Sequence, residues 1–163
     1  MRLLASASPR QLDLGLTMLR TVTGAIFAAH GAQKLFVFGF DGVTGAFGGM
    51  GVPLPGIVGP ATAMLEFFGG LAMVVGLLTR PVAVALSVAM LGALVVVHLP
   101  NGFFLPNGYE FVLALFGAAA TLGITGAGAW SIDGLIARRL ASHGGANRQE
   151  RRAAAQRDLR HAA

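Results

Sequence analysis

Four long apolar stretches constrain the fold of this chain more than any other feature. They cover residues 12–38, 57–78, 82–99 and 109–125, the last being the shortest. An α-helix needs about 20 mostly apolar residues to cross about 30 Å of hydrocarbon, and each stretch comes close to that length. We therefore predict an all-α fold, a four-helix transmembrane bundle, in which residues 1–135 form the membrane domain.

The composition favours a membrane protein over a soluble enzyme. Of the 163 residues, 55% are hydrophobic and 12% are charged, whereas soluble domains carry about 25% charged residues. The chain has no cysteine, which excludes disulfides, thiol catalysis, iron–sulfur ligation and cysteine-based zinc sites. We expect no metal site.

The excess positive charge lies at one end of the chain. The net charge is +5, yet the first 133 residues hold five basic and five acidic groups, so the whole excess follows them. A polybasic segment directly after apolar stretches is typical of a membrane-surface or positive-inside signal. We interpret residues 136–163 as a basic cytoplasmic tail, partly disordered, and expect contact with membrane lipids and no nucleic-acid partner.

Basic residues also predict the orientation in the membrane. Arg2 and Arg10 precede the first stretch, Arg80 separates the second from the third, and the basic tail follows the fourth. The loops 39–56 and 100–108 contain neither lysine nor arginine. Because basic loops stay in the cytoplasm, we predict a multi-pass protein with both termini cytoplasmic. The first stretch is much longer than the apolar region of a signal peptide, about 7–15 residues, so we predict that it is retained.

Ionisable side chains inside the apolar stretches are the candidates for function, because they are costly in a membrane and usually face the bundle interior. Arg20, His30 and Lys34 share one face of the first stretch at 3.6 residues per turn. Glu66 lies at about the same depth as His30, about 12–14 Å from the predicted outer ends, so the two can meet. The full candidate cluster for ligand binding, weighted toward the outer half of the bundle, is Arg20, His30, Lys34, Glu66, His98, Asn101 and Glu110.

These residues also have structural interpretations. Lys34 and Glu110 can snorkel to the lipid headgroups, and Arg20 can anchor a helix by bonding to backbone carbonyls. His30 and Glu66 can form a buried pair that fixes the helix register. Both kinds of interpretation stay open on the sequence alone.

Two further features concern packing. Gly24 and Ala28 form a pair of small residues one turn apart, which lets another helix approach closely, and Phe27 beside them is interpreted as a packing residue. The segment 42–55 is apolar but rich in glycine and proline. It either caps the outer end of the bundle over a pocket or lies among the headgroups.

Short motifs follow one another in a distinctive order along residues 12–135. They are Leu19-Arg20, Gly24, Phe27, His30-Gly31, Lys34-Leu35, Gly51-Val52-Pro53, Glu66 with Gly69-Gly70, Gly76 to Arg80, His98 to Phe103, Gly108-Tyr109-Glu110 and Ser131-Ile132-Asp133. In this order they resemble the DoxX family of small four-helix membrane proteins. The resemblance implies a bacterial inner-membrane protein, similar to small subunits associated with quinone-linked redox complexes. The basic tail departs from the family pattern.

Three functions stay open at this stage. The first is an accessory or quinone-pocket subunit of a membrane redox complex, in which partner subunits supply the electrons and this chain need not be catalytic. The second is a structural or assembly role, and the third is binding or transport of a small or lipid-like molecule. The sequence does not assign a cofactor, and quinone is a candidate. Haem ligation by His30 and His98 is disfavoured, because they differ by about 10 Å in depth and no C-x-x-C-H site exists. A second copy of the chain is a further candidate partner.

Overall fold

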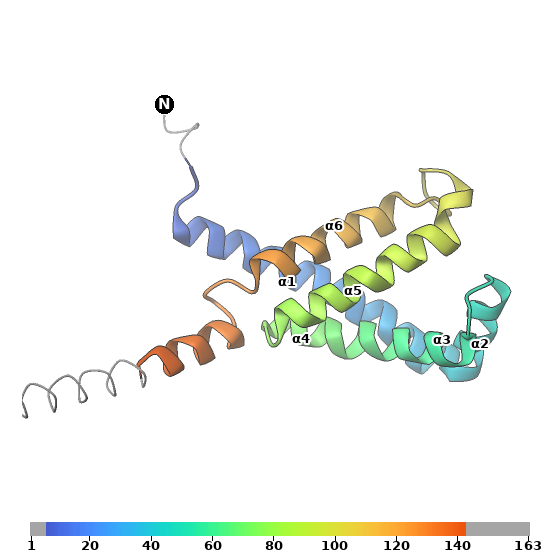
Figure 1. The fold of residues 1–163 in the computed structure, drawn as a ribbon, viewed down its shortest axis with the longest axis horizontal. Coiled ribbons are helices and arrows are strands. Elements are labelled where there is room, and N and C mark those ends of the chain that lie inside the picture. The colour runs from blue at the N-terminus through green and yellow to red at the C-terminus, as the bar shows by residue number, and fades with distance from the viewer. Residues whose placement is uncertain (1–5, 143–163) are drawn as a thin grey trace, which may run out of the picture.

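The computed structural model describes residues 6–142, and the regular secondary structure in that range is entirely helical (Figure 1). In chain order the elements are α1 (Pro9–Ala32), η2 (Gln33–Phe38), α2 (Gly39–Gly49), α3 (Pro55–Met64), η3 (Leu65–Gly69), α4 (Gly70–Val75), α5 (Thr79–Ala93), η4 (Leu94–His98), η5 (Leu99–Asn101) and α6 (Glu110–Thr125). Of these, η2, η3 and η4 are π-helical and η5 is a 3-10 turn. Residues 132–142 form a further helix.

Three helical stretches are long and apolar enough to cross a membrane: Pro9–Gly49, Pro55–Val75 and Thr79–Asn101. Helix α6 is apolar too but has 16 residues. Large apolar side chains point outward, with Val88 65% and Ile124 79% exposed, and so apolar a surface suits lipid better than water. The predicted all-α membrane fold is confirmed, while the fourth crossing and the orientation stay predictions.

The predicted tail is described only at its start. Our boundary between residues 135 and 136 falls inside the helix over residues 132–142. Residues 143–163, and the disorder expected for part of them, lie outside the described residues.

Local sequence explains where the first helices begin and end. Ser8 and Gln11 form a capping box at the start of α1, with Pro9 in the first turn, where its missing N–H costs little. Gly39 adopts a φ of +67°, which favours glycine, and it interrupts the helix between η2 and α2. We predicted residues 39–56 as a loop, and α2 was missed because glycines fill much of its length.

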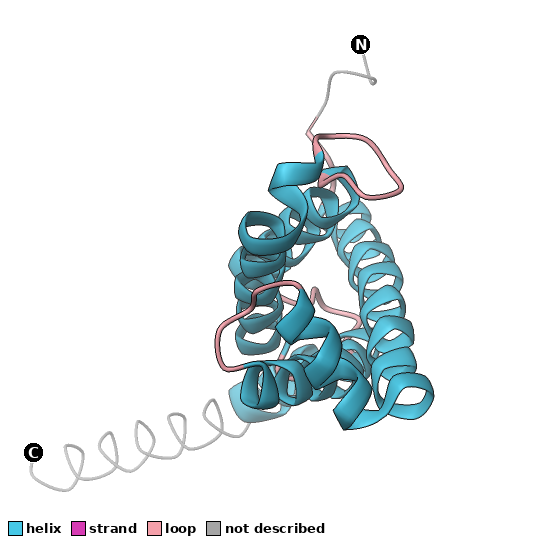
Figure 2. Ribbon diagram, turned by 90° about the vertical axis from the view of Figure 1, so that its right-hand side faces the viewer, coloured by secondary structure: helices cyan, strands magenta, loops and turns pink. Residues whose placement is uncertain are grey.

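The helices form two packed groups. In the first, α1 packs against η3 and α4, and α2 packs against α3. In the second, α5 packs against α6. We call the end that carries residues 6–9, the turn at 76–78 and residues 126–131 the termini end, and the opposite end the loop end. Figure 2 looks at the loop end, with the loop between α5 and α6 at the top and α2 with its following loop below.

Glycines allow α1 to approach its neighbour closely. A Cβ atom on Gly24 would lie 2.7 Å from the carbonyl oxygen of Gly70. A Cβ on Gly31 would collide with the backbone of Phe67, and one on Gly70 with the backbone of Ala28. The close approach predicted for Gly24 and Ala28 is therefore present, and Gly31 and Gly70 extend it.

The hydrophobic core fills the termini half of the bundle. Its fully buried members include Met73, Ala83, Leu86, Ala119 and Leu122, which lie in the termini halves of the α4, α5 and α6 stretches. Toward the loop end the two helix groups diverge, as Figure 1 shows. The divergence leaves room between the groups, and the site described next lies there.

Candidate functional site

A pocket of about 540 Å³ lies between the two helix groups in the loop half of the molecule. Phe27, Met90, Val112 and Leu115 belong both to the pocket lining and to the core, so the top of the core forms the pocket floor. The volume lies in the range typical of small-molecule sites. Most of the lining is apolar, and the polar groups are few and gathered.

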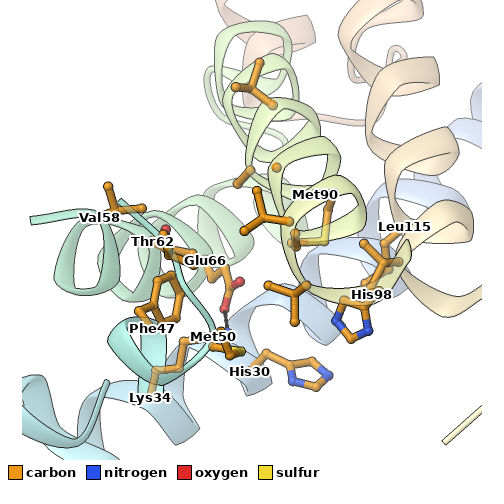
Figure 3. A pocket seen from close by; sticks show the side chains of 18 of the residues that line it. His30, Lys34, Phe47, Met50, Val58, Thr62, Glu66, Met90, His98 and Leu115 are labelled. Atoms are coloured by element: carbon orange, nitrogen blue, oxygen red, sulfur yellow. Dashed lines mark hydrogen bonds and ion pairs between the residues drawn. The ribbon is translucent and has the colours of Figure 1, made fainter. Parts of the chain in front are cut away.

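The polar groups of the pocket centre on Glu66. Its side chain is almost fully buried and forms an ion pair with Lys34, which reaches it from η2 (Figure 3). Thr62 lies one turn before Glu66 on the same face and also lines the pocket. Within the described residues no hydrogen bond involves the Thr62 side chain, so its hydroxyl is free to bond to a ligand.

Glu66 lies at mid-depth of its helical stretch. It follows Pro55 by eleven residues, so it lies about 16 Å from the loop end at 1.5 Å per residue. This position is close to the middle of a stretch of 21 residues, which is long and apolar enough to cross a membrane. A carboxylate there is expensive, which makes Glu66 with its partner Lys34 a functional-site candidate on physical grounds.

Two histidines complete the polar set. The His30 ring lies against Phe111, with 6.0 Å between the ring centroids, and within the described residues no hydrogen bond involves it. The Nδ1 atom of His98 lies 3.0 Å from the carbonyl oxygen of Asn107. Both rings line the pocket, as Figure 3 shows, so His30, Lys34, Glu66 and His98 are brought together as the sequence predicted.

Three of these four pocket residues lie in π-helical segments. Lys34 belongs to η2, Glu66 to η3 and His98 to η4. A π-helical turn is rare and occurs often at functional sites, where it redirects a side chain. The sequence carries no recognisable signal for these turns, so this feature of the site could not be predicted.

The segment after α2 closes part of the loop end of the pocket. Phe47 of α2, followed by Met50, Val52 and Pro53, lines the pocket from this side. The structure thus favours the first of our two interpretations of residues 42–55, a cap over a pocket.

The ion pair differs from the one that we considered. A pair of His30 with Glu66 was one interpretation of the sequence, but the carboxylate pairs with Lys34. Lys34 starts nearer the loop end, and its long side chain bends inward to the carboxylate instead of outward to the headgroups. Thr62 was missed, although it shares a helix face with Glu66 at a spacing of four residues.

Arg20 lies away from the pocket, at the termini end. The residue is 4% exposed, and its guanidinium donates hydrogen bonds to the carbonyl oxygens of Met73, Val74 and Trp130. The first two carbonyls belong to the last turn of α4, where a cation is favourable. Arg20 is therefore placed as the carbonyl anchor that we considered, and not beside His30.

Asn101 and Glu110 also lie outside the pocket lining. The Asn101 side chain donates to the carbonyl oxygen of Val97 at 2.9 Å. Glu110 accepts a hydrogen bond of 2.8 Å from the backbone N–H of Leu105. Both side chains thus hold the backbone at the loop end, between the third and fourth stretches.

A second polar network at the termini end was not predicted from charge or spacing. Both carboxylate oxygens of Asp133 accept hydrogen bonds of 2.8 Å, from the backbone N–H groups of Leu78 and Thr79 at the start of α5. Asp13 likewise accepts from the N–H of Ala129 at 2.8 Å. These bonds tie the segment after α6 to the turn before α5 and to α1.

Within residues 6–142, no three histidine or acidic side chains come together in a metal-binding arrangement. The polar groups that line the pocket are the ion pair of Lys34 with Glu66, the hydroxyl of Thr62 and the imidazoles of His30 and His98.

The fold and the pocket define a helical membrane protein that contains an apolar pocket with a small polar centre. The chain belongs to the DoxX family: residues 15–99 match the DoxX family model. The predicted resemblance is thereby confirmed.

Similar proteins come from several bacteria. The chain is 30% identical to the Bacillus subtilis protein named "Putative oxidoreductase CatD" over 127 residues, 78% of this chain and 90% of that protein. It is 34% identical to the Escherichia coli "Inner membrane protein YqjF" over 126 residues, 76% of this chain and 93% of that protein. It is 31% identical to the Mycobacterium tuberculosis "Uncharacterized membrane protein Rv3486", covering 77% and 83% of the two chains. No solved structure matches the chain significantly.

Proposed function

We propose that this protein binds a quinone in its pocket and serves as an accessory subunit of a membrane redox complex. The observation that carries the proposal is the paired charge of Lys34 and Glu66 beside the free hydroxyl of Thr62, inside an otherwise apolar pocket. A quinone has a ring with two carbonyl oxygens, which need hydrogen-bond donors, and an apolar remainder, which needs an apolar wall. The Bacillus relative carries the name "Putative oxidoreductase CatD", which supports a redox role.

Each polar residue has a role in this proposal. Thr62 and His30 donate hydrogen bonds to the quinone oxygens, and the Lys34 ammonium stabilises negative charge on the reduced ring. Reduction of the quinone to the quinol takes up two electrons and two protons. Partner subunits supply the electrons, while Glu66 and His30 each pass one proton to a ring oxygen and are then reprotonated from water. Oxidation of the quinol runs through the same groups in reverse.

The proposed setting is the bacterial inner membrane, with several crossings and both termini in the cytoplasm. Two relatives from Escherichia coli are named as inner membrane proteins. The loop-end segments 39–56 and 100–108 lack basic residues, whereas Arg10, Arg80 and Arg138 lie toward the termini end. By the positive-inside rule the pocket then belongs to the outer half of the membrane.

The test is quinone occupancy in a variant that removes one donor. Thr62→Val keeps the shape of the side chain, and losing one hydrogen bond of about 0.5–1.5 kcal/mol lowers quinone affinity by about 2- to 12-fold. The matched control is Thr121→Val on the exposed side of α6, where the hydroxyl donates to the carbonyl of Gly117. Quinone bound per protein is measured by mass spectrometry after titration in lipid nanodiscs. Equal affinity in the wild type and both variants would contradict the proposed role of Thr62, and absence of quinone from wild type would contradict the function.

A structural or assembly role is the second candidate, and one observation favours it. The ion pair of Lys34 with Glu66 joins η2 to η3 across two packed helices, as expected of a pair that fixes their register. The double variant Lys34→Met with Glu66→Gln separates the two roles. A purely structural pair predicts lower stability with unchanged quinone occupancy per folded protein, whereas the quinone proposal predicts that occupancy falls.

A further inference from the structure

Several residues that line the pocket are also exposed, and they come from the two stretches that flank the space between α3 and α5. Helix α5 packs against η3 and α4 but not closely against α3, which lies nearer the loop end. Three residues of α5 and the following η4 that line the pocket are spaced by four: Val88 and Gly92 of α5 and Val96 of η4. All three are exposed, Val88 by 65% and Val96 by 42%. They therefore line the pocket and the outer surface at once.

The opposite rim comes from α3. Val58 and Thr62 line the pocket from that helix, and both are partly exposed. Thr62 lies one turn from Glu66, so this space leads directly to the polar centre. Between the two rims there is no side chain to fill the space at Gly92, where an added Cβ would meet nothing within 4 Å.

The space between α3 and α5 lies at the depth of the hydrocarbon. Gly92 follows Thr79, the first residue of α5, by thirteen residues, so it lies about 20 Å along a spanning stretch of 23 residues. The loop end, by contrast, is partly covered by Met50, Val52 and Pro53. A solute from the water must pass this cover, whereas a molecule dissolved in the lipid meets the open rim directly.

We propose that the gap between α3 and α5 is a lateral portal, through which a lipid-dissolved amphiphile enters the pocket from the bilayer. Its polar head lies at Thr62 and Glu66, and its apolar chain stays in the gap beside Gly92. The inference deepens the proposed function, since it restricts the quinone to one with an apolar chain. A phospholipid offers the same combination of polar head and apolar chain, and the experiment below separates the two.

The test blocks the portal at Gly92. Gly92→Trp places an indole in the gap, and Gly92→Leu fills it partly. The matched control is Gly117→Trp on α6, another exposed glycine with nothing within 4 Å of an added Cβ and outside the pocket lining. Each variant is reconstituted in nanodiscs with a quinone that carries a ten-carbon chain. Bound quinone and bound phospholipid are then counted by native mass spectrometry.

The portal predicts at least a tenfold loss of quinone occupancy in Gly92→Trp, an intermediate loss in Gly92→Leu and no change in Gly117→Trp. Wild-type occupancy in both Gly92 variants would overturn it. If wild type binds no quinone but holds a phospholipid that Gly92→Trp loses, the portal stands and the quinone function fails. If neither quinone nor phospholipid binds to the wild type, the portal is overturned together with the function.

Discussion

At the scale of single residues, burial separates two kinds of charged side chain in this protein. The terminal nitrogens of Arg20 donate to three backbone carbonyls at the termini end, its buried Nε has no hydrogen-bond partner among the described residues, and the residue does not line the pocket. Glu66 pairs with Lys34, and the pocket lies beside this pair. The Arg20 contacts thus hold backbone segments together, whereas the Glu66 carboxylate keeps acceptor capacity beside the pocket. We therefore assign a structural role to Arg20 and a functional role to the pair of Lys34 with Glu66.

Breaking the pair on one side should cost more than removing it whole. Lys34→Met leaves the buried Glu66 without a partner, and we expect a loss of about 3 kcal/mol in the free energy of unfolding. Adding Glu66→Gln removes the uncompensated charge and should restore most of that loss. Chemical denaturation in detergent measures both. A double variant that is less stable than Lys34→Met alone would contradict this account of the pair.

Substitution of Arg20 should lower stability without changing quinone binding. Arg20→Leu leaves the carbonyls of Met73, Val74 and Trp130 without their donor, at a cost of about 3 kcal/mol. Because Arg20 does not line the pocket, quinone bound per folded protein should equal that of wild type. Denaturation and mass spectrometry of the same preparation give the two values. Unchanged stability with lost quinone would place Arg20 in the site after all.

At the scale of elements, the packing of α1 depends on glycines rather than on its apolar side chains. Gly24 and Gly31 face backbone atoms of the neighbouring stretch, whereas Gly15 of the same helix faces open space. A residue count along α1 does not distinguish these positions, but the structure does. They therefore offer a matched pair of substitutions within one helix.

Gly31→Ala should destabilise the protein by about 3 kcal/mol, because its Cβ collides with the backbone of Phe67 and forces α1 away from η3. Gly15→Ala should stabilise it by about 0.5–1 kcal/mol, since alanine is the better helix former. Denaturant midpoints in one detergent give both values. Equal effects of the two substitutions would contradict the close approach of α1 and η3.

Some of the helical elements could be predicted from the sequence and others could not. The predicted stretch 12–38 ends where η2 ends, and 109–125 matches α6 to within one residue, because hydrophobic length alone determines them. The helix α2 and the π-helical turns could not be predicted. The glycines in α2 lower its helix propensity, so the sequence pattern there is not that of a helix. The π-helical turns depend on contacts between helices. Four of the seven candidate residues line the pocket, namely His30, Lys34, Glu66 and His98, because an ionisable side chain in an apolar stretch is conspicuous. The pairing of Lys34 with Glu66 could not be predicted, because it depends on the reach of the lysine side chain.

At the scale of the whole molecule, the distribution of basic residues predicts the orientation. The loop end carries the pocket, and the termini end carries Arg10, Arg80 and Arg138. The chain contains no cysteine, so a single introduced cysteine reports unambiguously on its own position. We expect Gly45→Cys in intact cells to react with a membrane-impermeant maleimide, and Ser142→Cys to react only after the cells are opened. The reverse pattern would contradict the orientation.

The central claim is that a quinone with an apolar chain binds beside Glu66. The most direct measurement is photolabelling of the wild-type protein in native membranes by a quinone that carries a diazirine on its ring, followed by peptide mapping. The account predicts covalent label in residues 27–34 and 62–66, and loss of that label when unlabelled quinone competes. Label spread over lipid-facing residues such as Met18 and Ile124, with no competition, would contradict it.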